Sequence, residues 1–335
     1  MFNSKKIKAL AVLANLIFGA LSSSTAFTAD PTAVSSSLPS EKSSFIMDNA
    51  GTLKSYKGNS SMVTLPEGIK KIAFGAFKNK KEIEEITLPE SLETIDDYAF
   101  YSCTSLKSIA IPKNVRSIGC LAFGKCENCK DIEIGEGLEA VKKFAFWECK
   151  NLKNITVKAE NPNFSSYQGM LYNKDFSNLK ICPAAIQKEV TLHENTKSIS
   201  SYAFQGCENL ERLSKNGDKT ISIYDAAFQD CKNLKYIDFE DKIDFIGPGA
   251  FTNCTSLKKF TIGEKVKFIG SSVFMGCNSL ENIIVKAKGD LKIGHKIFES
   301  CSHVISVLAD KNSPLAKYVK KHSNKLILNI KTTLF

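Results

Sequence analysis

The sequence lacks the short motifs that identify many enzymes. It contains no Gly-x-Ser-x-Gly, no His-Glu-x-x-His and no glycine-rich loop placed to hold a phosphate. Histidine is scarce, with 4 in 335 residues, and neither His193 nor His322 has a cysteine or a paired carboxylate at motif spacing. We therefore expect no catalytic residue and no cofactor.

Long apolar runs are also missing after the N-terminal segment. No later stretch approaches the ~18 apolar residues that a membrane-spanning helix needs. With 43% hydrophobic and 24% charged residues, the composition is that of a globular chain. It excludes a disordered chain, a collagen and a polytopic membrane protein.

Acidic residues are absent from both ends of the chain. The formal net charge is +10, but residues 1–26 hold three lysines without an acid and residues 311–335 hold six, so the body between them is near +1. A nucleic-acid binder spreads positive charge along one face, and we expect no such partner here. The lysines from Lys317 to Lys331 form either the solvated side of a cap or a contact with a polyanion or an anionic surface.

The N-terminus has the order of a secretory signal peptide. A basic stretch, Met1–Lys8, precedes the apolar run Ala9–Leu21 and then small residues. The sequence predicts a signal peptide over residues 1–26, with cleavage possible as far as residue 29, and a linker over residues 27–44. The alternative is a retained N-terminal membrane anchor, the one case in which we expect a membrane contact.

Phenylalanine recurs with a fixed period. Successive members are 23 or 24 residues apart except for one step of 58, and they are Phe77, Phe100, Phe123, Phe146, Phe204, Phe228, Phe251, Phe274 and Phe298. Ile or Val stands five positions before each, Ala directly before seven of them, and Cys three positions after eight of them. Apolar-x-apolar pairs follow nine and eleven positions later in seven repeats. Repetition of this kind indicates a stack of identical units that share one core.

Each apolar-x-apolar pair predicts a short strand, because side chains alternate along a strand. A strand this short needs a neighbour, so each coil pairs its strand with the preceding one in a parallel sheet. The predicted fold is a repeat solenoid over residues 45–312, with about eleven rungs. Lys215 occupies an apolar position, which predicts a distorted or frayed rung at Leu213–Lys215.

The step of 58 residues contains an insertion over residues 158–188. Within it, a polar turn separates two short apolar stretches, Gly169–Tyr172 and Leu179–Ile181, and this pattern predicts a β-hairpin. The hairpin replaces the Ala-Phe-x-x-Cys half of one repeat. At the other end, residues 313–335 predict a cap: a helix that begins at Ser313-Pro314, then a closing strand over Leu326–Ile330. Such a cap covers the bare core of the last repeat.

The segment from Cys103 to Cys126 reads Cys-x-x-Leu-x-x-Ile-x-Ile-Pro-x-x-Val-x-x-Ile-Gly-x-x-Ala-Phe-x-x-Cys. This pattern resembles the BspA-like leucine-rich repeats, a 23-residue subclass, over about residues 60–330. The resemblance implies a right-handed horseshoe with the parallel sheet on one face, short turns or 3-10 helix on the other, one inserted hairpin and a capping helix. It also implies a secreted or surface protein that binds host extracellular proteins or neighbouring cells. No wall-sorting or lipid-attachment signal is visible, so the adhesive role rests on analogy.

The eleven cysteines argue for a packed core rather than a disulfide framework. Eight share one repeat position, where parallel Cβ vectors suit a disulfide poorly and a small buried hydrophobe well. Cys129 takes a core Leu position, while Cys120 and Cys182 fall out of phase. His295, Cys301 and His303 lie within nine residues, but their spacing matches no zinc signature, and we expect no metal.

The surface of the predicted sheet remains as the candidate binding site. Repeat stacks present an extended concave sheet face to partners. The candidate residues on it are Thr87, Glu133, Thr156, Arg212, Tyr236, Asp238, Lys259 and Thr261. Their mixed charge favours a protein partner, including a host extracellular protein; the alternative is a solvated face with no partner.

The sequence thus predicts a non-enzymatic interaction module. We expect an exported leucine-rich-repeat protein, extracellular or at the cell surface, that mediates protein–protein interaction, including adhesion to host or extracellular proteins. One alternative is a periplasmic or effector-type repeat protein that binds an envelope or intracellular host partner. The other is an enzyme or a metal carrier.

Overall fold

The computed structural model describes residues 41–287, 290–302, 305–321 and 326–330. The predicted signal peptide and most of the predicted linker lie outside these residues, as do His303 and His322. In the described ranges, none of the helices has the length and hydropathy of a membrane span.

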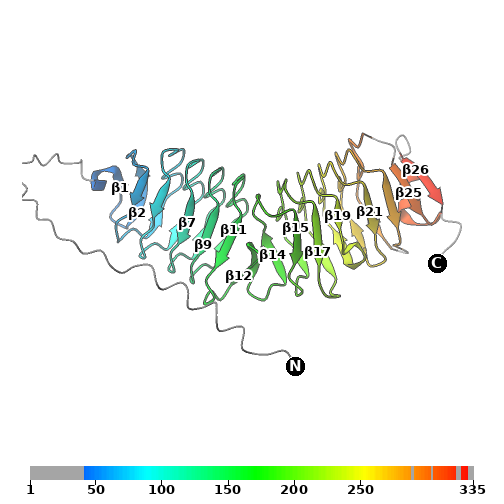
Figure 1. The fold of residues 1–335 in the computed structure, drawn as a ribbon, viewed down its shortest axis with the longest axis horizontal. Helices are drawn as coiled ribbons and strands as arrows, with labels where there is room; N and C mark the ends of the chain where they lie inside the picture. The colour runs from blue at the N-terminus through cyan, green and yellow to red at the C-terminus, as the bar shows by residue number, and fades with distance from the viewer. Residues whose placement is uncertain (1–40, 288–289, 303–304, 322–325, 331–335) are drawn as a thin grey trace, which may run out of the picture. The chain divides into compact units, whose positions relative to one another are not determined.

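Residues 41 onward form a β-solenoid whose turns lie side by side from β1 to β26 (Figure 1). One strand of each turn contributes to what we call the long-strand sheets. These strands are β3 (Met62–Thr64), β5 (Glu85–Thr87), β7 (Ser108–Ile111), β9 (Asp131–Ile134), β11 (Asn154–Val157), β15 (Glu189–Leu192), β17 (Arg212–Lys215), β19 (Tyr236–Ile237), β21 (Lys259–Ile262), β23 (Asn282–Val285), β25 (Ile305–Ala309) and β26 (Leu326–Ile330). They form four sheets, and within each sheet neighbours pair in parallel one repeat apart, so that Ile109 lies beside Ile132 and Ile132 beside Ile155. The predicted parallel strands are confirmed.

A second set of parallel strands was not predicted. The short-strand sheets are built from β4 (Lys71–Ile72), β6 (Thr94–Ile95), β8 (Ser117–Ile118), β10 (Ala140–Val141), β16 (Ser198–Ile199), β18 (Ile221–Ile223), β20 (Ile243–Ile246), β22 (Phe268–Ile269) and β24 (Lys292–Ile293). At the N-terminal end, β1 (Phe45–Met47) and β2 (Thr52–Tyr56) form an antiparallel pair, and β2 continues in parallel to β4. The expectation of a sheet on one face only is therefore wrong: each turn has strands on two sides, with turns connecting them. The structure also contains two short 3-10 helices, Glu41–Ser44 and Glu240–Lys242.

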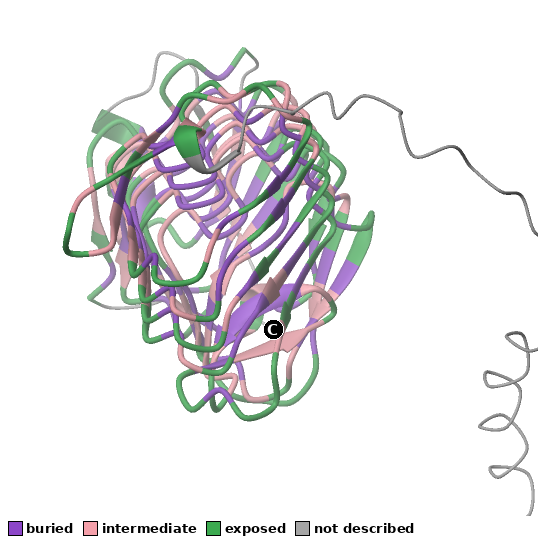
Figure 2. Cartoon of the chain, turned by 90° about the vertical axis from the view of Figure 1, so that its left-hand side faces the viewer, coloured by how far each residue is buried: buried purple, intermediate pink, exposed green. Residues whose placement is uncertain are grey.

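The phased phenylalanines form the core, as predicted. Phe77, Phe100 and Phe123 are fully buried, and their rings stack at centroid distances of 4.9 and 5.0 Å. The backbone adds a second ladder, since the N–H of Phe100 donates to Ala122 O and that of Phe123 to Ala145 O. The coils surround this buried interior, and exposed residues lie on their outside (Figure 2).

The cysteines at the shared position are buried. Each thiol donates to a backbone carbonyl of the preceding turn; Cys126 Sγ lies 3.2 Å from Phe100 O and Cys254 Sγ lies 3.2 Å from Phe228 O. Cysteine suits this position because it is small and apolar and still carries a weak donor. Of the two out-of-phase residues, Cys182 is buried and Cys120 is half-buried.

The insertion contains three strands rather than the two predicted. The predicted hairpin is present as β13 (Met170–Asn173) and β14 (Asn178–Ile181), and β12 (Phe164–Tyr167) pairs with the other edge of β13. β14 then takes the place of a short strand, because it pairs in parallel with β16. The buried Asn161 anchors the entry to the insertion: its amide donates to Gly135 O and Leu138 O, and its Oδ1 accepts from the backbone of Phe164.

The insertion divides the hydrophobic core into two parts. One core cluster runs from Phe45 to Phe164 and includes Leu171; the other includes Met170 and Tyr172 and continues to Val319. Because side chains alternate along β13, one strand serves both cores. The long-strand sheets and the short-strand sheets are both interrupted here.

The rung at Lys215 is better ordered than predicted. All four residues of β17 pair in register with β15, and only Arg212 and Leu213 pair with β19. Lys215 is buried, yet its Nζ donates to Asn216 O at 3.0 Å and Glu194 O at 3.4 Å. Burial lowers the pKa of this lysine, and the two carbonyls satisfy its ammonium group.

The C-terminal end matches the predicted cap. Helix α1 (Pro314–Lys321) buries Leu315 and Val319, and its lysines are exposed. The Tyr318 hydroxyl accepts a hydrogen bond from the N–H of Ile297 in the last turn. β26 pairs in parallel with β25 and ends the sheet.

Candidate functional site

The eight predicted binding residues lie on the outer surface of the long-strand sheets or directly beside it. Six are exposed, whereas Glu133 and Thr261 are half-buried. They belong to different sheets, with Thr87 on β5, Glu133 and Thr156 on β9 and β11, and the remainder from β17 to β21. They therefore do not form one compact site.

Three of them form a patch, which we call the Arg212 patch: Arg212, Tyr236 and Asp238. Arg212 and Tyr236 occupy neighbouring positions on β17 and β19. Arg212 Nε lies 2.7 Å from Asp238 Oδ2, and this partner raises the arginine pKa. Tyr236 is 61% exposed, a large fraction for an aromatic side chain on a sheet.

The other candidates have local partners. Glu133 forms an ion pair with Lys158, and Thr156 lies beside Glu133 in the register of the sheet. The backbone N–H of Thr261 donates to the carboxylate of Glu240 at 2.9 Å. Burial raises the pKa of Glu240, while the hydrogen bond from Thr261 acts in the opposite direction.

A pocket that was not predicted lies where the insertion rejoins the solenoid. The connection from short strand to long strand is shorter here: 14 positions separate Ile118 from Ile132, but only 11 separate Leu179 from Val190. The shortened turn, residues 178–186, does not fill the layer between its neighbours. A space of about 580 Å³ results, which we call the junction pocket.

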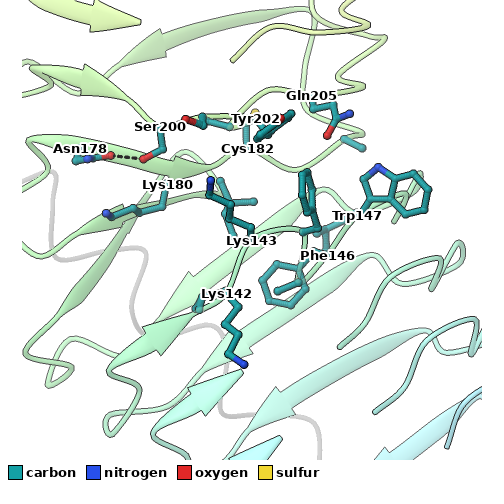
Figure 3. A pocket seen from close by; sticks show the side chains of 18 of the residues that line it. Lys142, Lys143, Phe146, Trp147, Asn178, Lys180, Cys182, Ser200, Tyr202 and Gln205 are labelled. Carbon is teal, nitrogen blue, oxygen red and sulfur yellow. Dashed lines mark hydrogen bonds between the residues drawn. The ribbon is translucent and has the colours of Figure 1, made fainter. Parts of the chain in front are cut away.

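Residues mainly from three turns line the junction pocket (Figure 3). Phe144, Phe146 and Trp147 contribute from the turn before the insertion, which we call the Phe146 turn, residues 140–149. Tyr202 and Gln205 contribute from the Phe204 turn, residues 198–207; Lys180, Ile181 and Cys182 come from the shortened turn. Across the gap, the rings of Phe144 and Tyr202 meet edge to face at a centroid distance of 4.8 Å.

Backbone N–H and C=O groups without a hydrogen-bond partner among the described residues line this pocket. In the preceding turn, the N–H groups of Phe123 and Lys125 donate to Ala145 O and Trp147 O. The equivalent N–H groups of Phe146 and Glu148 have no acceptor among the described residues. On the other side of the pocket, the carbonyl oxygen of Gln205 has no donor among these residues, whereas the equivalent carbonyl oxygens in other turns accept from the preceding turn. The shortened turn satisfies only one such group, through the bond from Cys182 N to Ala203 O at 2.7 Å.

The charge around the junction pocket is positive. Glu139 pairs with Arg116 at 2.8 Å and Glu148 with Lys125 at 3.5 Å, whereas Lys142 pairs with Asp97 at 3.0 Å. For the other two lining lysines, Lys143 and Lys180, no ion pair occurs within the described part of the chain. The pocket thus carries two lysines without a local counter-charge.

No metal-binding arrangement accompanies either site. In the described ranges, no three His, Cys, Asp or Glu side chains are grouped so that they could hold a metal ion. Cys301 lies in the core, where its thiol donates to Phe274 O, and His303 is outside these ranges.

Parallel strands stacked turn upon turn around a phased aromatic core define a leucine-rich-repeat solenoid. A family model described as the BspA type leucine rich repeat region matches residues 54–176 and 183–305 in six copies. The chain belongs to this family, and the predicted resemblance is confirmed.

Solved structures share the fold. The pneumococcal vaccine antigen PcpA is 21% identical, with a TM-score of 0.60 over 82% of this chain and 80% of PcpA. A leucine-rich repeat protein from Eubacterium ventriosum is 20% identical, with a TM-score of 0.54 over 75% of this chain and 88% of that protein. No curated protein matches the chain.

Proposed function

We propose that this chain is a non-catalytic binding module that holds a protein partner on its long-strand sheets, centred on the Arg212 patch. The observation that supports this most directly is the pairing of an exposed tyrosine with an arginine on neighbouring strands. Tyrosine and arginine are enriched among the residues that dominate protein interfaces. The bond between Arg212 and Asp238 holds the guanidinium in one place before a partner arrives.

We further propose that the protein is exported and displayed outside the cell, where the partner is an extracellular or host protein. The order of basic, apolar and small residues in the first 29 positions supports export. The structural similarity to a vaccine antigen is in keeping with surface display. Fractionation of the source cells, with an antibody against the full chain, tests this directly; retention in the cytosol would contradict it.

The binding role is tested by affinity capture from host extracellular matrix extracts. The bait is the full chain, compared with Tyr236→Ala and Arg212→Ala. We expect each variant to bind its partner at least about tenfold more weakly, as for a central interface residue.

Phe74→Ala is the matched control, because Phe74 is equally exposed at 63% but lies outside the long-strand sheets. This variant should capture the partner as the parent does. Equal capture by all four proteins would overturn the assignment of the Arg212 patch.

A further inference from the structure

The junction pocket is a gap in an otherwise continuous hydrogen-bonded ladder. In seven other turns, the next turn of the same chain satisfies the outward N–H groups at the Phe position and two residues after it. These are the turns of Phe77, Phe100, Phe123, Phe204, Phe228, Phe251 and Phe274. The last turn, at Phe298, has no further turn of this kind beside it among the described residues. The Phe146 turn retains the same backbone conformation, with positive φ at Phe144 (62°) and Glu148 (55°). Its N–H groups are therefore aligned for acceptors that the shortened turn does not supply.

Aligned N–H groups of this kind attract anionic oxygens. Backbone N–H groups that lie on one side of a turn without an acceptor favour negative charge beside them. Lys143 and Lys180 line the same pocket without a local carboxylate partner. Both features favour a ligand with carboxylates.

The interior of the pocket suits an aromatic ring. Phe146 stacks on Phe123 at 5.8 Å, but its other neighbour along the ladder, Phe204, belongs to a turn two positions further on. Ile181, Cys182 and Trp147 complete the apolar walls. The volume is within the range of pockets that bind small ligands and peptide side chains.

We propose that the junction pocket binds an acidic peptide segment of a partner protein that carries an aromatic side chain. The ring enters between the Phe146 turn and the Phe204 turn, and the carboxylates face Lys143, Lys180 and the open N–H groups. The segment replaces the part of a turn that the chain itself lacks. This site is separate from the Arg212 patch, and neither proposal depends on the other.

The chain's own N-terminal segment is a poor occupant on grounds of charge. Residues 1–40 carry three lysines and a single acid, Asp30, a net charge of +2, and the part that follows the predicted cleavage, residues 27–40, keeps only that one carboxylate. A cationic segment would meet two lysines that already lack counter-charges. An acidic segment from another protein is complementary instead.

The chain contains a reporter for this site. Trp147 is the single tryptophan of the sequence, and it lines the junction pocket. We would titrate the full chain with the terminally blocked peptide Asp-Ala-Ala-Phe-Gln-Asp and record tryptophan fluorescence. This peptide copies Asp225–Asp230, an intact turn of the same solenoid, and it contains no fluorophore that competes with tryptophan.

We expect a saturable change in Trp147 emission with a dissociation constant on the order of 0.1 mM, typical of a short peptide. Two further peptides separate the contributions: Asn-Ala-Ala-Phe-Gln-Asn removes the charge and Asp-Ala-Ala-Ser-Gln-Asp removes the ring. Each should bind about tenfold more weakly. Raised salt should weaken the acidic peptide and leave the neutral one unchanged.

Variants of the protein locate the site. The double variant Lys143→Gln/Lys180→Gln should weaken binding about tenfold. Lys265→Gln/Lys267→Gln removes the same charge at exposed positions outside the pocket and should bind as the parent does. Thermal melting of both variants establishes that they fold.

Three results would each overturn the proposal. One is the absence of a saturable emission change with the parent protein. Another is equal binding of the peptide without phenylalanine, which would indicate charge attraction alone. The third is an equal loss in the two lysine double variants, which would show that the contact is not at the junction.

Discussion

The regular turns and the junction use the same backbone conformation with opposite results. In the regular turns of Phe100 and Phe123, the two rings stack and the backbone N–H of Phe100 donates to a carbonyl of the next turn. The thiol of Cys126 donates to a carbonyl of the preceding turn. Between Phe146 and Phe204, the shortened turn leaves some of these groups open. The comparison shows that a repeat protein can create a pocket by leaving part of one unit out, without any special residue.

The two core clusters sharpen this comparison. Each cluster is continuous through its own turns, and β13 separates them by sending Leu171 to one side and Tyr172 to the other. Stability in such arrays is close to a sum of nearest-neighbour terms. The interface at the junction should therefore be the weakest in the stack.

The largest expected effect is the contrast between two phenylalanines of the ladder. Phe123→Ala should destabilise the protein by about 3–5 kcal/mol, because the ring is fully buried between Phe100 and Phe146. Phe146→Ala should cost about 2 kcal/mol, since the space it leaves joins the open pocket and forms no sealed cavity. Urea denaturation measures both losses.

The ranking of the two variants is the decisive outcome. A loss below about 1 kcal/mol for Phe123→Ala would contradict the burial of the ladder. A loss for Phe146→Ala as large as for Phe123→Ala would show that the junction is packed in solution.

A smaller effect concerns the ring contact across the gap. Phe144 and Tyr202 meet at 4.8 Å although a shortened turn lies between their own turns. A double-mutant cycle with Phe144→Ala and Tyr202→Ala should give a coupling energy of about 1 kcal/mol in urea denaturation. The pair Phe74 and Tyr98, at 5.3 Å on adjacent turns, provides the reference cycle. If only the reference pair couples, the two sides of the pocket do not meet in solution.

The regular turns were predictable from the sequence because every copy repeats the same constraints. The constant spacing of the phenylalanines predicts a buried core, which Phe77, Phe100 and Phe123 form. The alternation of apolar residues at Ile109 and Ile111 predicts a strand. The short-strand sheets were missed since most of their strands, such as Ser117–Ile118, are two residues long and show no alternation to detect.

The junction was predicted only in part. The polar turn between Tyr172 and Leu179 indicated the antiparallel pair, but Phe164–Tyr167 carries serines at its centre and gave no strand pattern. The junction pocket depends on a connection three positions shorter than its neighbours and on contacts between the Phe146 and Phe204 turns. The missing Ala-Phe-x-x-Cys motif was the available signal, and it located the interruption without showing its width.

The buried thiols of the regular turns provide a last and smaller test, through pH. Desolvation raises the pKa of Cys103 from 9.0 to about 12. Above pH 9 the unfolded chain loses the thiol proton while the folded chain keeps it, so this contribution to stability is complete below pH 9 and is lost as pH rises toward 12. Between pH 8 and 9.5 one such thiol should lower the free energy of unfolding by about 0.8 kcal/mol.

Cys103→Ala isolates that contribution from the packing that the substitution also removes. Its free energy of unfolding, measured by urea denaturation under reducing conditions, should fall between the two pH values by about 0.8 kcal/mol less than that of the parent. Leu106→Ala is the control, because Leu106 is fully buried in the same turn but carries no proton to lose. It should be less stable at both pH values with the pH dependence of the parent. If Cys103→Ala keeps the full pH dependence, the Cys103 thiol ionises in the folded state, and this regular turn is as open to solvent as the junction.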